Sequence, residues 1–204
     1  MKLINNILAF LFPVRETAKQ IEDLSADNII AAYQPTEHTA CISLASFQNP
    51  IVRACIHEIK FYNNDKGARL LAELLTKWLE AHVHNPTLLL PVPLSSARFR
   101  KRGYNQVTRI AQYSCKQNKH LVLATKLLQR TRDTAPQTTL SRKDRKTNIK
   151  DAFRIRNTAA KKQLSNAHII LLDDVYTTGA TIRSAKQTLL DCNPASVTCV
   201  TIAH

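Results

Sequence analysis

The sequence predicts an α/β fold in which a mostly parallel, twisted sheet is flanked by helices. Short aliphatic runs alternate with longer stretches in which apolar residues recur every three or four positions, the pattern of strands separated by amphipathic helices. The four consecutive aliphatic residues 169–172 are typical of a strand buried on both faces of a parallel sheet. This run leads through two aspartates into a Thr/Gly turn that opens a helix. Open α/β folds bind ligands at such strand ends, so the sequence also predicts where a site lies.

The predicted helices follow from apolar spacing. Pro50 suits the first position of a helix, and apolar residues follow it at helical spacing. At the N-terminus an amphipathic helix is favoured over a signal peptide, because the apolar stretch contains two Asn and only one Lys precedes it. We expect helices over 1–14, 50–60 and 180–190, across 70–79, and ending near 117.

The predicted strands are short aliphatic or β-branched runs bounded by polar turns. They lie at 88–92, 121–130, 152–155, 169–172 and 197–202, with 29–33 and 40–45 forming a small hairpin. The polar connection 131–148 is long for a loop within a compact domain. We therefore expect it to act as a lid over a ligand.

Composition limits the kinds of protein that this chain can be. Its 204 residues suffice for one main α/β domain with a small appendage. The net charge of +14 indicates an anionic partner, which charge alone leaves open between a phosphorylated substrate, a nucleic acid and an acidic protein surface. The five cysteines form no C-x-x-C pair, so neither a zinc site nor a disulfide framework is indicated. This cysteine usage fits a reducing cytosol, so we expect a cytoplasmic location. No apolar run approaches about 18 residues, so we expect no membrane span.

The Thr/Gly turn at 175–181 has the features of a phosphate-binding loop. The first turn of a helix has unpaired backbone N–H groups and a partial positive charge, which together favour a phosphate. Thr177, Thr178 and Thr181 add hydroxyl donors, and Gly179 lets the backbone approach the ligand closely. The alternative is an ordinary capped helix, since Asp and Thr both favour N-cap positions. We favour the phosphate loop because the full pattern at 173–181 is rare. Two acids, any two residues, two Ser or Thr, Gly, any residue and a final Ser or Thr should occur in about one chain of this length in three thousand, from average residue usage.

Two aspartates, Asp173 and Asp174, stand between the strand and this loop. Adjacent residues of a regular strand point to opposite faces of a sheet. Both carboxylates therefore reach one side of a ligand only if the strand has already ended at Asp173.

A basic segment follows the strand predicted at 88–92. Four of five consecutive residues are positively charged: Arg98, Arg100, Lys101 and Arg102. After a parallel strand they would lie at the ligand-binding edge of the sheet, beside the phosphate loop. A solvated basic turn is the alternative, because charge clusters are common on protein surfaces.

The loop at 173–181 resembles the ribose-5-phosphate loop of type I phosphoribosyltransferases, which bind phosphoribosyl pyrophosphate. Further motifs are similar to the ComF (GntX-like, competence-associated) branch of that family: 60–62, 91–94 with 102–106, and a pattern from Pro136 to Phe153. The resemblance implies a type I phosphoribosyltransferase-like domain over 50–204, with a small helical and hairpin hood over 1–49.

One departure from that branch concerns zinc. ComF-like chains usually continue from a Phe-Pro lead-in into zinc-binding cysteines. Here Phe12 and Pro13 are present, but residues 14–22 contain no cysteine. Region 1–49 is therefore interpreted as a degenerate zinc-finger region, and zinc is not expected.

The resemblance implies a role for each candidate residue. Asp173 and Asp174 would hold the ribose hydroxyls, directly or through Mg²⁺ that arrives with the substrate; no dedicated set of metal ligands is predicted. The catalytic candidates are these aspartates with Arg102 and Arg145. The residues expected to bind phosphoribosyl pyrophosphate are Val175, Tyr176, Thr177, Thr178, Gly179, Ala180, Thr181, Arg98, Arg100, Lys101 and Arg142.

Two functions stay open at this point. The first is a phosphoribosyltransferase that acts on an unspecified nucleobase or amine. The second is a non-catalytic competence module that keeps the phosphoribosyl site and binds single-stranded DNA or DNA-processing proteins. An aspartate-dependent phosphatase using Asp173 is disfavoured, because the D-x-D arrangement of such enzymes is absent around it. The sequence specifies neither the acceptor nor the oligomeric state.

Overall fold

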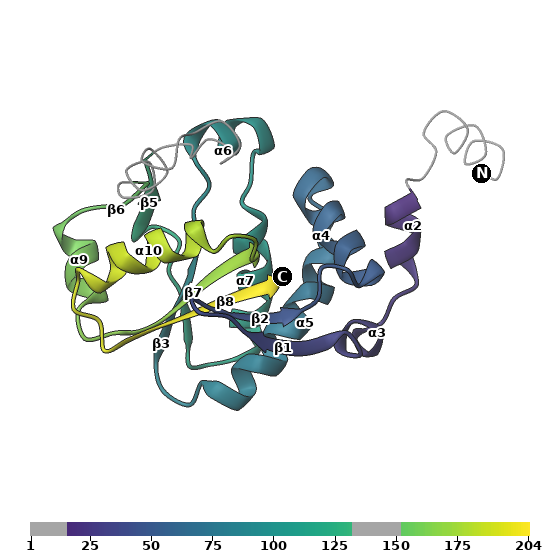
Figure 1. The fold of residues 1–204 in the computed structure, drawn as a ribbon, viewed down its shortest axis with the longest axis horizontal. Helices are drawn as coiled ribbons and strands as arrows, with labels where there is room; N and C mark the ends of the chain where they lie inside the picture. The colour runs from purple at the N-terminus through teal and green to yellow at the C-terminus, as the bar shows by residue number, and fades with distance from the viewer. Residues whose placement is uncertain (1–15, 132–151) are drawn as a thin grey trace.

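The protein is built on a six-stranded sheet (Figure 1). In the computed structural model, which describes residues 16–131 and 152–204, the strand order is β1-β2-β8-β7-β3-β4. β1 pairs antiparallel with β2, and the other neighbours in this sheet are parallel. The predicted fold class is confirmed. The strands are β1 (Tyr33–Glu37), β2 (Ile42–Ala45), β3 (Thr87–Pro91), β4 (Leu121–Leu123), β7 (His168–Val175) and β8 (Ser196–Ala203).

Helices cover both faces of this sheet. They are α2 (Glu16–Glu22), α3 (Ala26–Ile30), α4 (Pro50–Tyr62), α5 (Asp65–His82), α6 (Ser96–Arg102), α7 (Gln106–Gln117), α9 (Thr158–Leu164) and α10 (Ala180–Leu190). α5 and α7 pack on one face, and α4 packs against α5. α10 packs on the other face, near α9 and an antiparallel ribbon of β5 (Leu128–Arg130) and β6 (Phe153–Ile155).

β7 lies at the centre of the hydrophobic core. Its alternate side chains enter two different buried clusters, as the two-residue period of a strand requires. Ile170 and Leu172 join the cluster beneath α5 and α7, while Ile169 and Leu171 join the cluster beneath α10. All four are at most 3% exposed, so the strand is buried on both faces as predicted.

Asparagine side chains begin several of the helices. Asn49, Asn64, Asn105 and Asn157 each accept a hydrogen bond from a backbone N–H of the first turn that follows. Asn105 has a second contact, because its side-chain amide donates to the carbonyl of Val92 at 2.9 Å. This bond fixes the start of α7 against the end of β3.

Most of the predicted elements are confirmed within a few residues, and two predictions are wrong. The segment 121–130 is not one strand: the chain turns at 124–127, so β4 joins the main sheet whereas β5 pairs with β6. Residues 29–30 belong to α3, and the hairpin strand begins only at Tyr33. α6 and α9 were not predicted, because each has seven residues and too few apolar positions to show a helical period.

The N-terminal segment shares the core of the main sheet. β2 pairs with β8, with Ile42 opposite Val200, and Ile21 and Ile29 lie in the same buried cluster as α5. The division at residue 49 stays a prediction. The helix predicted at 1–14 and residues 132–148 of the predicted lid lie outside the described residues. In the described part of the chain, none of the helices has the length and hydropathy needed to cross a bilayer.

Candidate functional site

The loops after β3 and β7 start side by side at the carboxyl edge of the sheet. The two strands pair in register, with Leu90 opposite Leu171 and Pro91 opposite Leu172. One residue later the backbone N–H of Val92 donates to the carbonyl of Leu172 at 2.8 Å. The basic segment follows β3 and the Thr/Gly loop follows β7. Both predicted anion-binding segments therefore leave the sheet at one edge, where α/β folds bind ligands.

The Thr/Gly loop bends sharply before α10. Gly179 caps that helix with φ 70°, in the left-handed region that strains any residue with a Cβ atom. Thr177 and Thr178 are exposed ahead of the helix, where its backbone N–H groups carry partial positive charge. The loop thus has a bend and hydroxyl groups suited to a phosphate, although its binding of phosphate stays a prediction.

Two side chains pack over the bend of this loop. A Cβ atom on Gly179 would lie 2.6 Å from Tyr176 Cε2 and 2.6 Å from Arg183 Nη1. Arg183 Nη2 also donates to the carbonyl of Thr178 at 2.6 Å. The cavity that the loop forms with Asp173 measures about 20 Å³, which is room for about one water molecule. Seating a phosphate there requires Tyr176 or Arg183 to turn away.

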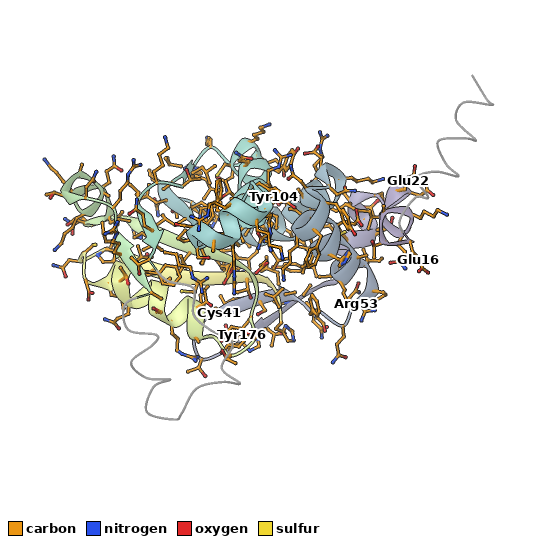
Figure 2. All side chains as sticks on the ribbon, turned by 90° about the horizontal axis from the view of Figure 1, so that it is seen from above. Glu16, Glu22, Cys41, Arg53, Tyr104 and Tyr176 are labelled. Carbon is orange, nitrogen blue, oxygen red and sulfur yellow. The ribbon has the colours of Figure 1, made fainter. Side chains whose placement is uncertain are left out.

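Tyr176 is held by a histidine from the β1–β2 turn. The rings of His38 and Tyr176 stack, with centroids 4.4 Å apart and an interplanar angle of 16°. The ring of His204 meets His38 edge-on at 5.0 Å. Burial, and to a lesser extent His204, lowers the pKa of His38, so this ring is neutral near pH 7. Cys41, after the same turn, belongs to the buried cluster against which Tyr176 packs, and both residues are labelled in Figure 2. The β1–β2 hairpin therefore contacts the candidate loop through His38.

The two aspartates point to opposite faces of the sheet. β7 continues to Val175, so it has not ended at Asp173. Asp174 lies on the α7 face, where its Oδ2 accepts a hydrogen bond from Gln106 Nε2 at 2.6 Å. Asp173 lies on the α10 face and lines the small cavity of the loop. A ligand that contacts both carboxylates must therefore lie across the end of β7.

The pKa of the Asp173 carboxyl group is raised. Burial raises its pKa well above the ordinary value, and the neighbouring Asp174 carboxylate raises it further. A hydrogen bond from the backbone N–H of Asp174 to Asp173 Oδ1, at 2.9 Å, and the charge of Arg130 offset this rise only in part. The residue as a whole is half-buried, but protein atoms surround its carboxyl group. A carboxylate so placed is suited to hydroxyl groups or a cation brought by a ligand.

A chain of hydrogen bonds joins the basic helix to Asp174. Arg102, the last residue of α6, donates from Nη1 to Gln106 Oε1, and Gln106 in turn donates to Asp174. Gln106 is 4% exposed, so its amide is fixed between the two charged groups. Arg102 is half-buried, whereas Arg98, Arg100 and Lys101 are exposed on α6. The structure thus brings one predicted arginine and one predicted aspartate into a single network.

Three of the residues that make these contacts were not predicted from the sequence: Gln106, Arg183 and His38. Gln106 lies in the 102–106 motif but had no assigned role. Arg183 follows Gly179 by four residues, about one helical turn. This spacing could have predicted that the Arg183 side chain lies near Gly179. No motif indicates His38. Arg142 and Arg145 lie outside the described residues, so their roles stay predictions.

Comparison with known families agrees with this architecture. Residues 60–204 match the phosphoribosyl transferase domain family. The chain belongs to this family. Within the phosphoribosyltransferase family, its relatives identify the ComF-like branch, and this predicted membership is confirmed.

Three relatives carry names that refer to DNA or competence. DNA utilization protein YhgH of Escherichia coli (strain K12) is 31% identical over 169 residues, 80% of this chain and 71% of the relative. Competence protein F of Haemophilus influenzae is 32% identical over 139 residues, 66% of this chain and 59% of the relative. Competence protein ComFC of Bacillus subtilis is 30% identical over 109 residues, 53% of this chain and 40% of the relative.

Proposed function

We propose that this phosphoribosyltransferase-family chain binds phosphoribosyl pyrophosphate across the end of β7 and transfers its phosphoribosyl group. The observation that carries the proposal is the network of Arg102, Gln106 and Asp174. It links a cation from the segment after β3 to an acid from the end of β7. One ligand with a diphosphate at one end and a diol in the middle matches such a pair of groups.

The proposed placement of the ligand follows the charges at this sheet edge. The 5-phosphate lies at the start of α10, on the hydroxyl groups and backbone N–H groups of 177–181. The ribose lies across the strand end, with Asp174 on one side and Asp173 on the other. The diphosphate lies at α6, beside Arg102 and its exposed basic neighbours. Arginine supplies a planar guanidinium group and lysine a flexible ammonium group. Arg142 and Arg145, outside the described residues, are proposed to close over it.

In the proposed reaction the bond between ribose C1 and the diphosphate oxygen breaks, and its electron pair leaves with pyrophosphate. A bond forms between C1 and a nitrogen of the acceptor, whose proton passes to pyrophosphate or water. Arg102 stabilises the charge that gathers on the leaving group, while the two aspartates stabilise positive charge on the sugar. Holding both reactants in line removes much of the entropic barrier.

Mg²⁺ suits this site as an ion that the substrate carries. Carboxylate oxygens are appropriate ligands for it, but Asp173 and Asp174 face opposite sides of the sheet and do not converge on one ion. Among the residues that the structure describes, no three His, Cys, Asp or Glu side chains are placed to hold a metal together. We therefore propose that one aspartate and the substrate's own oxygens hold the ion. Bound there, it supplies positive charge against the diphosphate.

A role in DNA handling is the second candidate, and the names of the relatives favour it. In this case the exposed residues Arg98, Arg100 and Lys101 bind phosphates of single-stranded DNA, and binding weakens steeply with salt. A cytoplasmic location is part of both proposals and is supported by the five free cysteines.

Two assays on the same protein separate binding from transfer. Phosphoribosyl pyrophosphate with Mg²⁺ should raise the melting temperature, by the equivalent of about 2.7 kcal/mol at a hundredfold excess over Kd. Addition of a panel of nucleobases and amines should then release pyrophosphate. Absence of the thermal shift would overturn the binding proposal. A shift without pyrophosphate release would overturn transfer, and salt-sensitive binding of single-stranded oligonucleotides would then favour the second candidate.

A further inference from the structure

A second cavity lies beside α6, apart from the proposed phosphoribosyl site. Its walls come from the loop after β3, from α6, from α7 and from the end of β4. It measures about 480 Å³, within the range of roughly 300–1,000 Å³ that is usual for small-molecule sites. Neither Arg102, nor Gln106, nor any residue of 173–181 lines it. The cavity is therefore a separate feature of the molecule.

One wall of this cavity is apolar and includes an exposed aromatic ring. Phe99 is 50% exposed although it lines the cavity, and Leu94 and Leu123 lie beside it half-buried. Large apolar side chains are usually covered, so an open ring in a concave site is informative. A flat, ring-shaped ligand would cover it by stacking.

The other lining groups can form hydrogen bonds but have few partners. Within the described residues the side chains of Thr108, Gln112 and Thr125 make no hydrogen bond. Arg109 also lines the cavity, and its Nε is buried without a partner in the described part of the chain. A buried N–H without an acceptor is costly, but this atom lies inside the cavity wall, so the groups open to a ligand are those of Thr108, Gln112 and Thr125.

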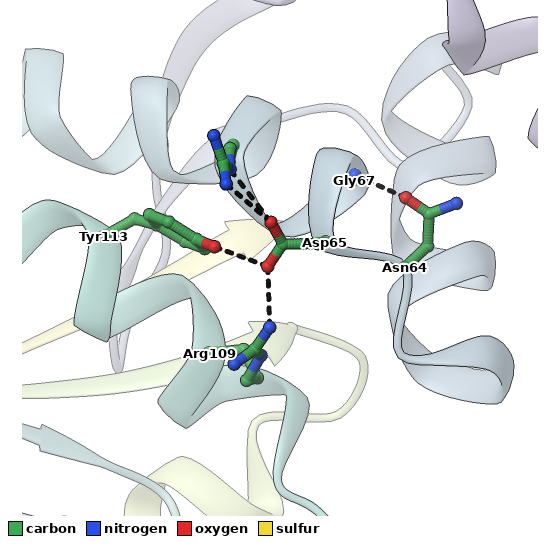
Figure 3. Close-up of polar contacts among 6 residues, drawn as sticks. Asn64, Asp65, Gly67, Arg109 and Tyr113 are labelled. Carbon is green, nitrogen blue, oxygen red and sulfur yellow. Dashed lines mark hydrogen bonds and ion pairs between the residues drawn. The ribbon is translucent and has the colours of Figure 1, made fainter.

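The charge of the cavity favours an uncharged ligand. Arg109 is the one charged residue among the described residues that line it, and Nη2 of that side chain is already bound to Asp65 at 2.6 Å (Figure 3). The hydroxyl and amide groups offer both donors and acceptors. The lining therefore matches a planar, neutral heterocycle that carries donors and acceptors on its edge.

We infer that this cavity binds a nucleobase, stacked on Phe99 and hydrogen-bonded to Thr108 and Gln112. Two sources present this chemistry: a free nucleoside and one base of a single-stranded nucleic acid. The inference does not depend on phosphoribosyl transfer, because none of the lining residues within 16–131 and 152–204 belongs to the proposed site for that reaction.

The test uses 2-aminopurine, a fluorescent base whose emission falls when it stacks on an aromatic ring. The free riboside is titrated into the full chain, and a short single strand with one central 2-aminopurine is titrated separately. We expect saturable quenching in at least one titration. Quenching by the uncharged riboside should be nearly independent of salt, and it identifies a free nucleoside as the ligand. Quenching of the strand alone, weakening with salt, identifies a base of a nucleic acid.

Variants locate the binding. Phe99→Ala should weaken it at least tenfold, and the paired change Thr108→Val with Gln112→Leu should do the same while keeping side-chain size. Phe61→Ala is the control for free riboside, because Phe61 is also exposed, at 59%, but does not line the cavity. Circular dichroism melts check folding of each variant. The inference is overturned if neither probe is quenched, or if riboside binding falls equally in Phe61→Ala and Phe99→Ala.

Discussion

Asp65, at the start of α5, and Asp173, near the end of β7, carry the same carboxyl group in opposite surroundings. Asp65 accepts hydrogen bonds from Tyr113, from Arg109 and from Arg69 (Figure 3), and these bonds, that of Tyr113 first, lower its pKa. For Asp173, burial and then the adjacent carboxylate raise the pKa.

In the proposed function, this difference separates a structural carboxylate, Asp65, from one that is proposed to bind a ligand, Asp173. Asp65 finds its partners on α5 and α7 and holds those helices together, so it needs nothing from outside the protein. Asp173 lies beside another carboxylate at a loop whose helix start favours anions. Two neighbouring carboxylates of this kind add no stability to the protein. Acid pairs with a perturbed pKa are therefore typical of binding sites.

Exchanging each aspartate for asparagine tests this difference with the largest expected effect. Asp173→Asn should abolish the thermal shift by phosphoribosyl pyrophosphate and Mg²⁺, a loss of about 2.7 kcal/mol at a hundredfold excess over Kd. The same change should raise the melting temperature of the free protein, because it removes a carboxyl group whose ionisation is opposed by burial and by the charge of Asp174. Asp65→Asn should lower that temperature by the equivalent of about 1 kcal/mol and leave the ligand shift intact. A full shift in Asp173→Asn, or none in Asp65→Asn, would contradict the assignment.

The stability cost of replacing a glycine should differ between the Thr/Gly loop and the end of α6. Gly179 and Gly103 both have positive φ, at 70° and 80°. Alanine should cost about 1–2 kcal/mol at each position through left-handed strain. The cost at Gly179 should be the larger, since its Cβ would meet Tyr176 and Arg183 at 2.6 Å, whereas Gly103 has nothing within 4 Å. Urea unfolding of the two variants measures both costs, and equal losses would argue against close packing over the loop.

The buried amide of Gln106 tests whether Asp174 depends on the network. Gln106→Leu keeps the side-chain volume but leaves Asp174 and Arg102 without their shared partner. We expect the Kd for phosphoribosyl pyrophosphate to rise about tenfold, equivalent to about 1.4 kcal/mol. Gln117→Leu, at the exposed end of the same helix, is the matched control and should leave the Kd unchanged. Calorimetric titration measures both, and an unchanged Kd in Gln106→Leu would remove the network from the site.

The smallest expected effect is the pH dependence that Asp65 adds to stability. Its folded pKa lies below the ordinary value of 3.8, so its contribution is present above that value and is lost as the pH falls through the folded pKa. The Asp65 side chain is 44% exposed, so we expect less than about 1 kcal/mol. Urea unfolding between about pH 6 and pH 2.5 should show a shallower acid decline in Asp65→Asn than in the original chain. Parallel declines would show that Asp65 is not the responsible group.

The sequence predicted those parts of the site that are continuous in the chain. The aliphatic run 169–172, the bend at Gly179 and the helix 180–190 lie where their local patterns place them. The opposite directions of Asp173 and Asp174 depend on how far β7 continues, which is set by its pairing with β8.

Contacts between distant segments could not be predicted in this way. Gln106 reaches Asp174 across 68 positions, and the stacking of His38 on Tyr176 joins the edge hairpin to the central strand's loop. Both depend on strand order: the first needs β3 beside β7, and the second needs β1 to lie beyond β8 and β2. A single sequence shows no periodicity that specifies such an order. The short strands β4 and β5 were merged in the prediction for the same reason, since their partners belong to different sheets.

The most direct test is the electron density of crystals soaked with phosphoribosyl pyrophosphate and Mg²⁺. We expect the 5-phosphate at the backbone amides of 177–181, the diphosphate beside Arg102, and the ribose across the end of β7 between Asp173 and Asp174. Ligand density elsewhere, or no ligand density at saturating concentration, would contradict the proposed site.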